Sequence, residues 1–180
     1  MKTKNLAMTA IFAALMCLAG LALRWVSPAL VPFSVLPLIV YLSGIILGAR
    51  YGALAMLVYI VLGLFGLPVF ASAPFAGLGY VLKPTFGFLI GYVAAAYVVG
   101  LIYKQGSLWR AVLGVFAGLV VIYLFGLAYL YGILNWVLVK PSSISKVMAI
   151  GFFPFITFDL IKAAISIWIG NEVVRRRMNY

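Results

Sequence analysis

The sequence predicts an all-α integral membrane protein, built as a single domain over residues 1–180 from a bundle of six transmembrane helices. Two observations lead to this fold class. First, 67% of the residues are hydrophobic and only 8% are charged, which excludes an ordinary soluble domain. Second, the apolar residues form long runs separated by short turns, and about 20 apolar residues are enough for a helix to cross a membrane.

The first helix is expected at 5–24, where Ala10 and Ala14 stand four residues apart. Small residues at this spacing let another helix approach closely. That helix belongs either to the same chain or to a partner subunit, and the pattern fits both. Pro28, Pro32 and Pro37 are then expected to break the chain into a loop that leads to the next helix.

Two short helices are expected at 35–47 and 51–65, separated by a tight basic turn at 48–52. The following stretch, 66–83, is rich in small and aromatic residues and is too apolar for a mobile hydrophilic linker. We expect it to fold back over the bundle, either as a lid over a site or as a packing loop with no ligand role.

The remaining helices are expected at 84–103, 108–135 and 149–171. Pro84 suits the first turn of its helix, where the missing backbone N–H costs little. Pro154 is expected to kink the last helix, because a proline inside a helix removes a backbone hydrogen bond.

The basic residues predict how the bundle is oriented. Six spans place both termini on one side, which then carries Lys2, Lys4, Arg50, Lys104, Arg110, Arg175, Arg176 and Arg177. The opposite side carries Arg24, Lys83, Lys140 and Lys146. Because the side richer in Lys and Arg stays in the cytoplasm, we expect cytoplasmic termini. The same scatter argues against nucleic acid as a partner, since its binding proteins cluster basic residues on one polar face.

The last apolar run contains one of the two acidic residues, Asp159, with Lys162 three positions later. Helical spacing places Phe152, Phe155 and Ser166 on the same face. Each charge at the centre of a membrane helix costs about 2.5–3.5 kcal/mol on insertion scales. Two readings stay open: a structural ion pair between packed helices, or a polar ligand site in which Asp159 accepts and Lys162 donates hydrogen bonds.

Several kinds of chemistry are excluded by what the sequence lacks. It has no histidine and one cysteine, Cys17, so an intrachain disulfide is impossible and a metal site of nitrogen or sulfur ligands is not expected. It has no phosphate-binding Gly-rich loop and no Ser/His/Asp set. We therefore expect neither an enzyme nor a bound cofactor, and no ATP site in this chain.

The polar residues suit binding of a small ligand with a polar head, an apolar body and, opposite a shallow cation, an anionic end. Besides Asp159 and Lys162, the candidate ligand-binding residues are Lys83, Tyr80, Phe75, Thr85, Tyr123 and Tyr129.

Four segments, in the same order along the chain, resemble the BioY family, the biotin-binding S components of energy-coupling-factor (ECF) vitamin transporters. They are 66–71 (GLPVFA), 79–92 (GYVLKPTFGFLIGY), 123–130 (YLFGLAYL) and 155–162, which carries the Asp-x-x-Lys spacing. Each segment alone is a weak signal, whereas four ordered matches are fairly specific. One departure is the loop at 71–75, which reads ASAPF here and is glycine-rich in many family members.

The resemblance implies a six-helix protein of the prokaryotic plasma membrane, with biotin bound near the outer face under the loops. It implies that Asp159 and Lys162 contact biotin and that Ala10 and Ala14 dock a transmembrane coupling subunit. Two cytoplasmic ATPase subunits, rather than this chain, would then bind the ATP.

The ureido ring of biotin offers N–H donors and a carbonyl acceptor, so we expect Asp159 to accept an N–H and Lys162 to donate to the carbonyl. The carboxylate would then lie near Lys83, while the reverse pose, with the carboxylate on Lys162, stays open. The alternatives are an S component for thiamine or riboflavin, or a structural membrane protein in which the Asp159–Lys162 pair locks two helices together.

Overall fold

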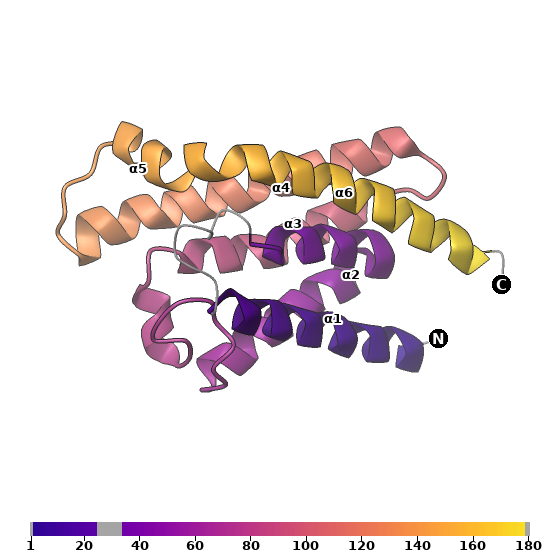
Figure 1. Ribbon diagram of the computed structural model, residues 1–180, viewed down its shortest axis with the longest axis horizontal. Helices are drawn as coiled ribbons and strands as arrows, with labels where there is room; N and C mark the ends of the chain where they lie inside the picture. The colour runs from indigo at the N-terminus through magenta and orange to yellow at the C-terminus, as the bar shows by residue number, and fades with distance from the viewer. Residues whose placement is uncertain (1, 25–33, 179–180) are drawn as a thin grey trace.

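The computed structural model describes residues 2–24 and 34–178, and every regular element within these ranges is helical (Figure 1). The elements are α1 (Lys2–Leu23), α2 (Leu36–Leu64), the 3₁₀-helix η2 (Leu78–Leu82), α3 (Phe86–Ile102), α4 (Leu108–Gly132), the π-helix η3 (Ile133–Val137), α5 (Ile144–Gly151) and α6 (Phe153–Met178). This confirms the all-α fold class. Two of the predicted linker prolines, Pro28 and Pro32, lie outside the described residues. The third, Pro37, does not belong to a loop: it stands in the first turn of α2, where the missing N–H costs little.

The helix α2 is folded back on itself at Gly48, whose φ of 76° and ψ of 176° are not helical. A Cβ atom at Gly52 would lie 2.9 Å from the carbonyl oxygen of Ser43, although nine residues of straight helix span about 13 Å. The two halves of α2 therefore pack side by side and correspond to the helices expected at 35–47 and 51–65. The tight turn predicted between them is confirmed.

Six passes result from this fold-back, as the sequence predicts. Within the described residues, four helices are long and apolar enough to cross a membrane: α1, α2, α4 extended by η3, and α6. The folded α2 supplies two passes, and the shorter apolar α3 completes the set. Figure 1 shows the N- and C-termini at the same end of the bundle, with α5 at the opposite end.

The last predicted helix, 149–171, is wrong at its start. The chain breaks at Phe152, where φ is −120° and ψ is −63°, so that α5 ends at Gly151 and α6 begins at Phe153. Pro154 stands in the first turn of α6. A proline lacks a backbone N–H, and its ring clashes with the carbonyl four residues earlier, so α5 cannot continue through Pro154 as one regular helix. The break turns the side chain of Phe152 toward the core.

The stretch 66–83 folds back onto the bundle, as predicted from its apolar composition. Val69 is 2% exposed and Phe70 is fully buried. The Phe70 ring stacks on Tyr80 at 4.1 Å between ring centres and meets the edge of Tyr59 at 5.8 Å. Gly20 of α1 lies so close to the Val69 carbonyl that a Cβ atom would overlap it. The loop is therefore part of the core at the end of the bundle opposite the termini.

Candidate functional site

The inner face of α6 carries the polar residues that the sequence singles out. Asp159 is 7% exposed, Lys162 is 9% exposed and Ser166 is fully buried. The intervening Leu160 and Ile161 are about half exposed and face outward. The Asp159 carboxylate forms an ion pair with the Lys162 ammonium, so the expected contact between the two residues is present. The pair lies inside the bundle, where charges are costly unless they are paired and hydrogen-bonded.

Neighbouring elements complete the hydrogen bonds of this pair. The hydroxyl of Tyr123 on α4 donates to the second carboxylate oxygen of Asp159. The Lys162 ammonium donates to the backbone carbonyl oxygen of Ser34, just before α2, at 3.0 Å. The group of Asp159, Lys162 and Tyr123 thus joins α4, α6 and the start of α2, and its donors and acceptors are those that a polar ring system would use.

Buried tyrosines extend from this group toward the folded-back loop. Tyr41 on α2 and Tyr92 on α3 are 0% and 8% exposed, and both lie within electrostatic reach of Asp159. Tyr92 is in turn within reach of Tyr59 and Tyr80. We call Tyr41, Tyr92, Tyr59 and Tyr80 the tyrosine column. Tyr80, one of the predicted site residues, belongs to the same buried cluster as Tyr123, the hydrogen-bond donor to Asp159.

Arg24, at the end of α1, stands at the loop end of the tyrosine column. Its Nε donates to the carbonyl oxygen of Phe70 at 3.2 Å, and its guanidinium carbon lies 4.4 Å from the centre of the Phe75 ring. Tyr59 lies within reach of its charge. The predicted site residue Phe75 therefore packs against the guanidinium of Arg24, a residue that was predicted only to lie on the outer side of the bundle.

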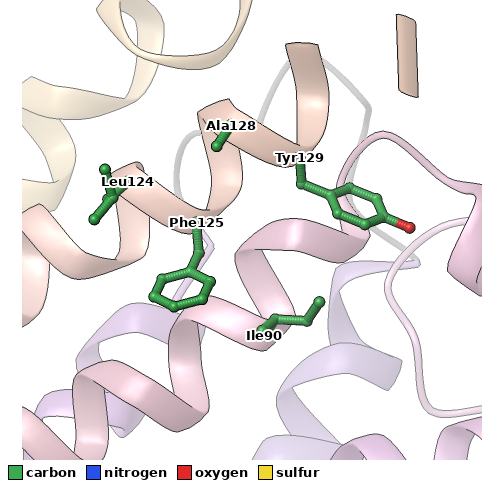
Figure 2. A pocket seen from close by; sticks show the side chains of 5 residues that line it. All are labelled: Ile90, Leu124, Phe125, Ala128 and Tyr129. Carbon is green, nitrogen blue, oxygen red and sulfur yellow. The ribbon is translucent and has the colours of Figure 1, made fainter. Parts of the chain in front are cut away.

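Tyr129, another predicted residue, lies away from Asp159. Its hydroxyl donates to the backbone carbonyl oxygen of Val81, and its ring meets the edge of Phe86 at 5.9 Å between ring centres. Figure 2 shows Tyr129 at an apolar pocket of about 290 Å³ between α3 and α4, lined also by Ile90, Leu124, Phe125 and Ala128. Leu124 is 64% exposed, so this hollow opens on the outside of the bundle and is separate from the group around Asp159.

Lys83 and Thr85 also remain apart from the Asp159–Lys162 pair. Lys83 is half-buried after η2, and Thr85 is exposed at the start of α3, where its side chain does not cap the helix. Within the described residues, neither side chain makes a hydrogen bond or an ion pair. Their assignment to a ligand site stays a prediction.

Arg24 and three residues of the tyrosine column, Tyr41, Tyr59 and Tyr92, were not singled out from the sequence. A tyrosine within an apolar helix gives no sign of whether it faces lipid or the bundle interior. Arg24 ends its helix, as a membrane-edge cation would. The sequence does hold one signal that could have pointed to Arg24. With two acidic side chains for 13 Lys and Arg residues, most cations of this chain have no carboxylate side chain to pair with.

The small-residue pair of α1 faces outward. Ala10 and Ala14 are exposed, next to Ile11, which is 52% exposed, whereas Phe12 and Ala13 are buried against the bundle. The pair therefore does not pack inside the chain, and its close-approach surface is open to another molecule.

Comparison with known proteins shows which family this sequence matches. The chain matches the BioY family over residues 1–179. A probable biotin transporter BioY of Lysinibacillus sphaericus is 38% identical over 176 residues, covering 96% of this chain and 88% of the relative. The biotin transporter BioY of Thermotoga maritima is 39% identical over 150 residues, covering 81% and 83%. The corresponding protein of Rhizobium etli is 33% identical over 188 residues, covering 97% and 95%.

A solved structure has the same fold. It is the crystal structure of the S component for biotin from an ECF-type ABC transporter, with a TM-score of 0.67, 22% sequence identity, and coverage of 97% of this chain and 92% of that one. The relatives are named as transporters, which agrees with the expectation that this protein is not an enzyme. Because the family match spans residues 1–179 and the relatives align along almost their whole length, the chain belongs to the BioY family.

Proposed function

We propose that this protein is a biotin-binding membrane subunit, the S component of an ECF-type ABC transporter, which captures biotin for ATP-driven uptake. The observation that carries the proposal is the buried group of Asp159, Lys162 and Tyr123. It lies in a chain of the BioY family whose relatives are named biotin transporters.

The donors and acceptors of this group suit a ureido ring. Asp159 accepts a hydrogen bond from a ring N–H, and Lys162 donates to the ring carbonyl. Both side chains are held in place beforehand, by Tyr123 and by the Ser34 carbonyl, so little side-chain ordering is left for the binding step. The aromatic residues of the tyrosine column supply the apolar surface that the rest of a small bicyclic ligand needs.

A cationic vitamin such as thiamine fits this interior less well. Asp159 is already paired with Lys162, and the other acidic residue, Glu172, pairs with Arg175 and Arg176 toward the opposite end of α6. A cation would therefore meet no unpaired side-chain carboxylate among the described residues.

The proposal includes orientation and partners. The excess of basic residues at the end that holds the termini supports a cytoplasmic location for that end, in a prokaryotic plasma membrane. The exposed face of α1 around Ala10 and Ala14 docks a transmembrane coupling subunit, whose helix approaches closely over the small side chains. The ATP is bound by two ATPase subunits attached to that partner.

The test is isothermal titration of the detergent-purified protein with biotin, comparing the wild type with Asp159→Asn and Glu172→Gln. Asp159→Asn leaves Lys162 buried without its counter-charge and is expected to weaken the free energy of biotin binding by about 3–5 kcal/mol. Glu172→Gln, the matched control, removes a carboxylate from an exposed ion pair and should leave binding unchanged. A folded wild-type protein that binds no biotin would discard the ligand, and a protein that instead binds riboflavin or thiamine would reassign it. Unchanged biotin binding by Asp159→Asn would leave the ion pair with a structural role alone.

A further inference from the structure

Arg24 carries a positive charge that no carboxylate of the described structure balances. The sequence has two acidic residues, Asp159 and Glu172, and both form ion pairs with other cations. The Nη2 atom of Arg24 is buried and has no hydrogen-bond partner within residues 2–24 and 34–178. A buried guanidinium N–H without an acceptor is costly, and the acceptor that best fits its planar fork is a carboxylate.

The guanidinium is also fixed in place. The hydrogen bond from Nε to the Phe70 carbonyl holds one edge, and the Phe75 ring covers one face. Phe70 itself is fully buried, so its carbonyl is anchored in the core. The remaining edge of the guanidinium is thus preorganised, as a binding group should be.

A second buried polar atom lacks a partner, and it lies near the other end of the tyrosine column. The hydroxyl of Tyr41, a residue with 0% exposure, has no hydrogen-bond partner among the described residues and lies within reach of the Asp159 charge. Arg24 Nη2 and the Tyr41 hydroxyl are the two buried side-chain nitrogen or oxygen atoms in the described structure with this property. Buried polar groups are almost always satisfied, so each of these two atoms calls for an explanation.

Both atoms border one buried cluster of aromatic residues. Phe70, whose carbonyl accepts from Arg24, stacks on Tyr80 and meets the edge of Tyr59. Tyr59, Tyr80, Tyr92 and Tyr41 all belong to the same hydrophobic core cluster. A ligand that carries both a carboxylate and a polar ring offers an acceptor to the Arg24 guanidinium and a hydrogen-bond partner to the Tyr41 hydroxyl.

We propose that Arg24 binds the carboxylate of the ligand, while the Tyr41 hydroxyl joins Asp159 and Lys162 in binding its polar ring. The inference rests on the proposed function, and it assigns the direction in which biotin lies in the site. It also replaces Lys83 as the expected carboxylate partner, because no hydrogen bond or ion pair with the described residues holds the Lys83 side chain in place. Arg24 is then the residue that makes the protein selective for the free acid over its neutral derivatives.

The test compares biotin with biotinamide, which has the same ring and chain but no negative charge. Both are titrated into the purified full-length protein, as wild type, Arg24→Gln and Lys83→Gln. Arg24→Gln is expected to weaken biotin binding roughly 10- to 100-fold, the effect of losing a charge-assisted pair. It should leave biotinamide affinity nearly unchanged, so that the preference for the acid disappears. Lys83→Gln should keep the wild-type preference.

Three results would overturn the inference: a wild-type protein with no preference for biotin over biotinamide, an Arg24→Gln variant that retains the preference, or a loss of preference in Lys83→Gln instead. If Arg24→Gln weakened the binding of both ligands equally, Arg24 would only hold the loop in place, and this result would also contradict the inference. If Arg24→Gln does not fold, Arg24→Lys keeps the charge and should show an intermediate preference, whereas an unaltered one would contradict binding by the guanidinium fork. Failure of the wild type to bind either compound would instead remove the proposed function itself.

Tyr41→Phe tests the other end of the ligand. It deletes one oxygen atom that bonds nothing in the described structure, so protein stability should not fall. Affinities for biotin and biotinamide should drop by the same factor, roughly 3- to 10-fold. Unchanged affinity for both would contradict the role of the Tyr41 hydroxyl.

Discussion

The hydroxyl of Tyr123 on α4 donates a hydrogen bond to the carboxylate of Asp159 on α6, 36 residues away in sequence. One oxygen of the carboxylate therefore receives a neutral donor and the other receives the Lys162 ammonium. This bond ties two membrane helices together and orients a charge inside the bundle. The same contact thus belongs both to the stability of the fold and to the geometry of the proposed site.

Tyr123→Phe is expected to weaken biotin binding by about 1–2 kcal/mol, because Asp159 loses one of its donors and its orientation loosens. The ring contacts with Phe88 and Phe152 remain in the variant, so packing should be nearly unchanged. Calorimetric titration measures the change. Tyr131→Phe, which removes a hydroxyl from the more exposed part of α4, is the control and should bind normally. Equal affinities of wild type and Tyr123→Phe would show that this bond does not orient the site.

The ion pair itself can be separated into its two roles by a double substitution. Removing one partner, as in Lys162→Met, strands a buried charge and should lower stability by about 3–5 kcal/mol. Removing both, as in Asp159→Asn with Lys162→Met, should restore much of that stability, because no charge is left buried. Unfolding in detergent measures stability, and biotin titration of the same samples should show no binding in either variant. Recovery of binding in the double variant would contradict a ligand role for the pair.

Gly48→Ala tests the fold-back of α2. The φ of 76° and ψ of 176° at Gly48 belong to a region that essentially only glycine occupies, and an added Cβ would meet nothing within 4 Å. The expected loss of stability, about 1–3 kcal/mol, is therefore a backbone effect alone. Gly132→Ala, at a helical φ of −62°, is the control and should be neutral or slightly stabilising. If both substitutions changed the unfolding midpoint alike, the turn at Gly48 would not be under this constraint.

A bulky side chain on the outer face of α1 should separate binding from uptake. Ala14→Phe fills the small surface that a partner helix would approach, while biotin titration with the isolated protein should be unaffected. Co-purification with the coupling subunit and uptake of labelled biotin by cells should both fall strongly. Ala164→Phe, a matched change at an exposed position of α6, is the control. Normal uptake with Ala14→Phe would place the docking surface elsewhere.

Much of the fold could be predicted from the sequence, because membrane helices have a strong compositional signal. The turn at Gly48 and the inward face of α6 followed from glycine chemistry and helical spacing. The start of α6 was misplaced, since Pro154 was read as a kink within one helix and the chain instead breaks at Phe152. Because α5 ends at Gly151, Pro154 falls in the first turn of a new helix, where its missing N–H costs little.

The site was less accessible to sequence reasoning. Asp159 and Lys162 stood out because charges are rare in apolar helices. Tyr129 is a different case, because its position beside the other tyrosines in sequence does not fix its direction, and it points toward Val81 and the pocket between α3 and α4. The place of Arg24 depends on a loop that returns to the end of α1, a long-range contact that no local pattern encodes.

The fold-back at Gly48 also affects the lipid around the protein. After the turn, α2 continues for about 16 residues and α3 has 17, so each is roughly 25 Å long, whereas α4 with 25 residues reaches about 37 Å. Leu57 on α2 and Leu101 on α3 are 46% and 65% exposed, so these short helices face the acyl chains. A bilayer core is about 30 Å thick, and mismatch costs fractions of a kcal/mol per ångström. We therefore expect the bilayer to be thinner along this flank than along α4, and the stability of the protein to depend on acyl-chain length.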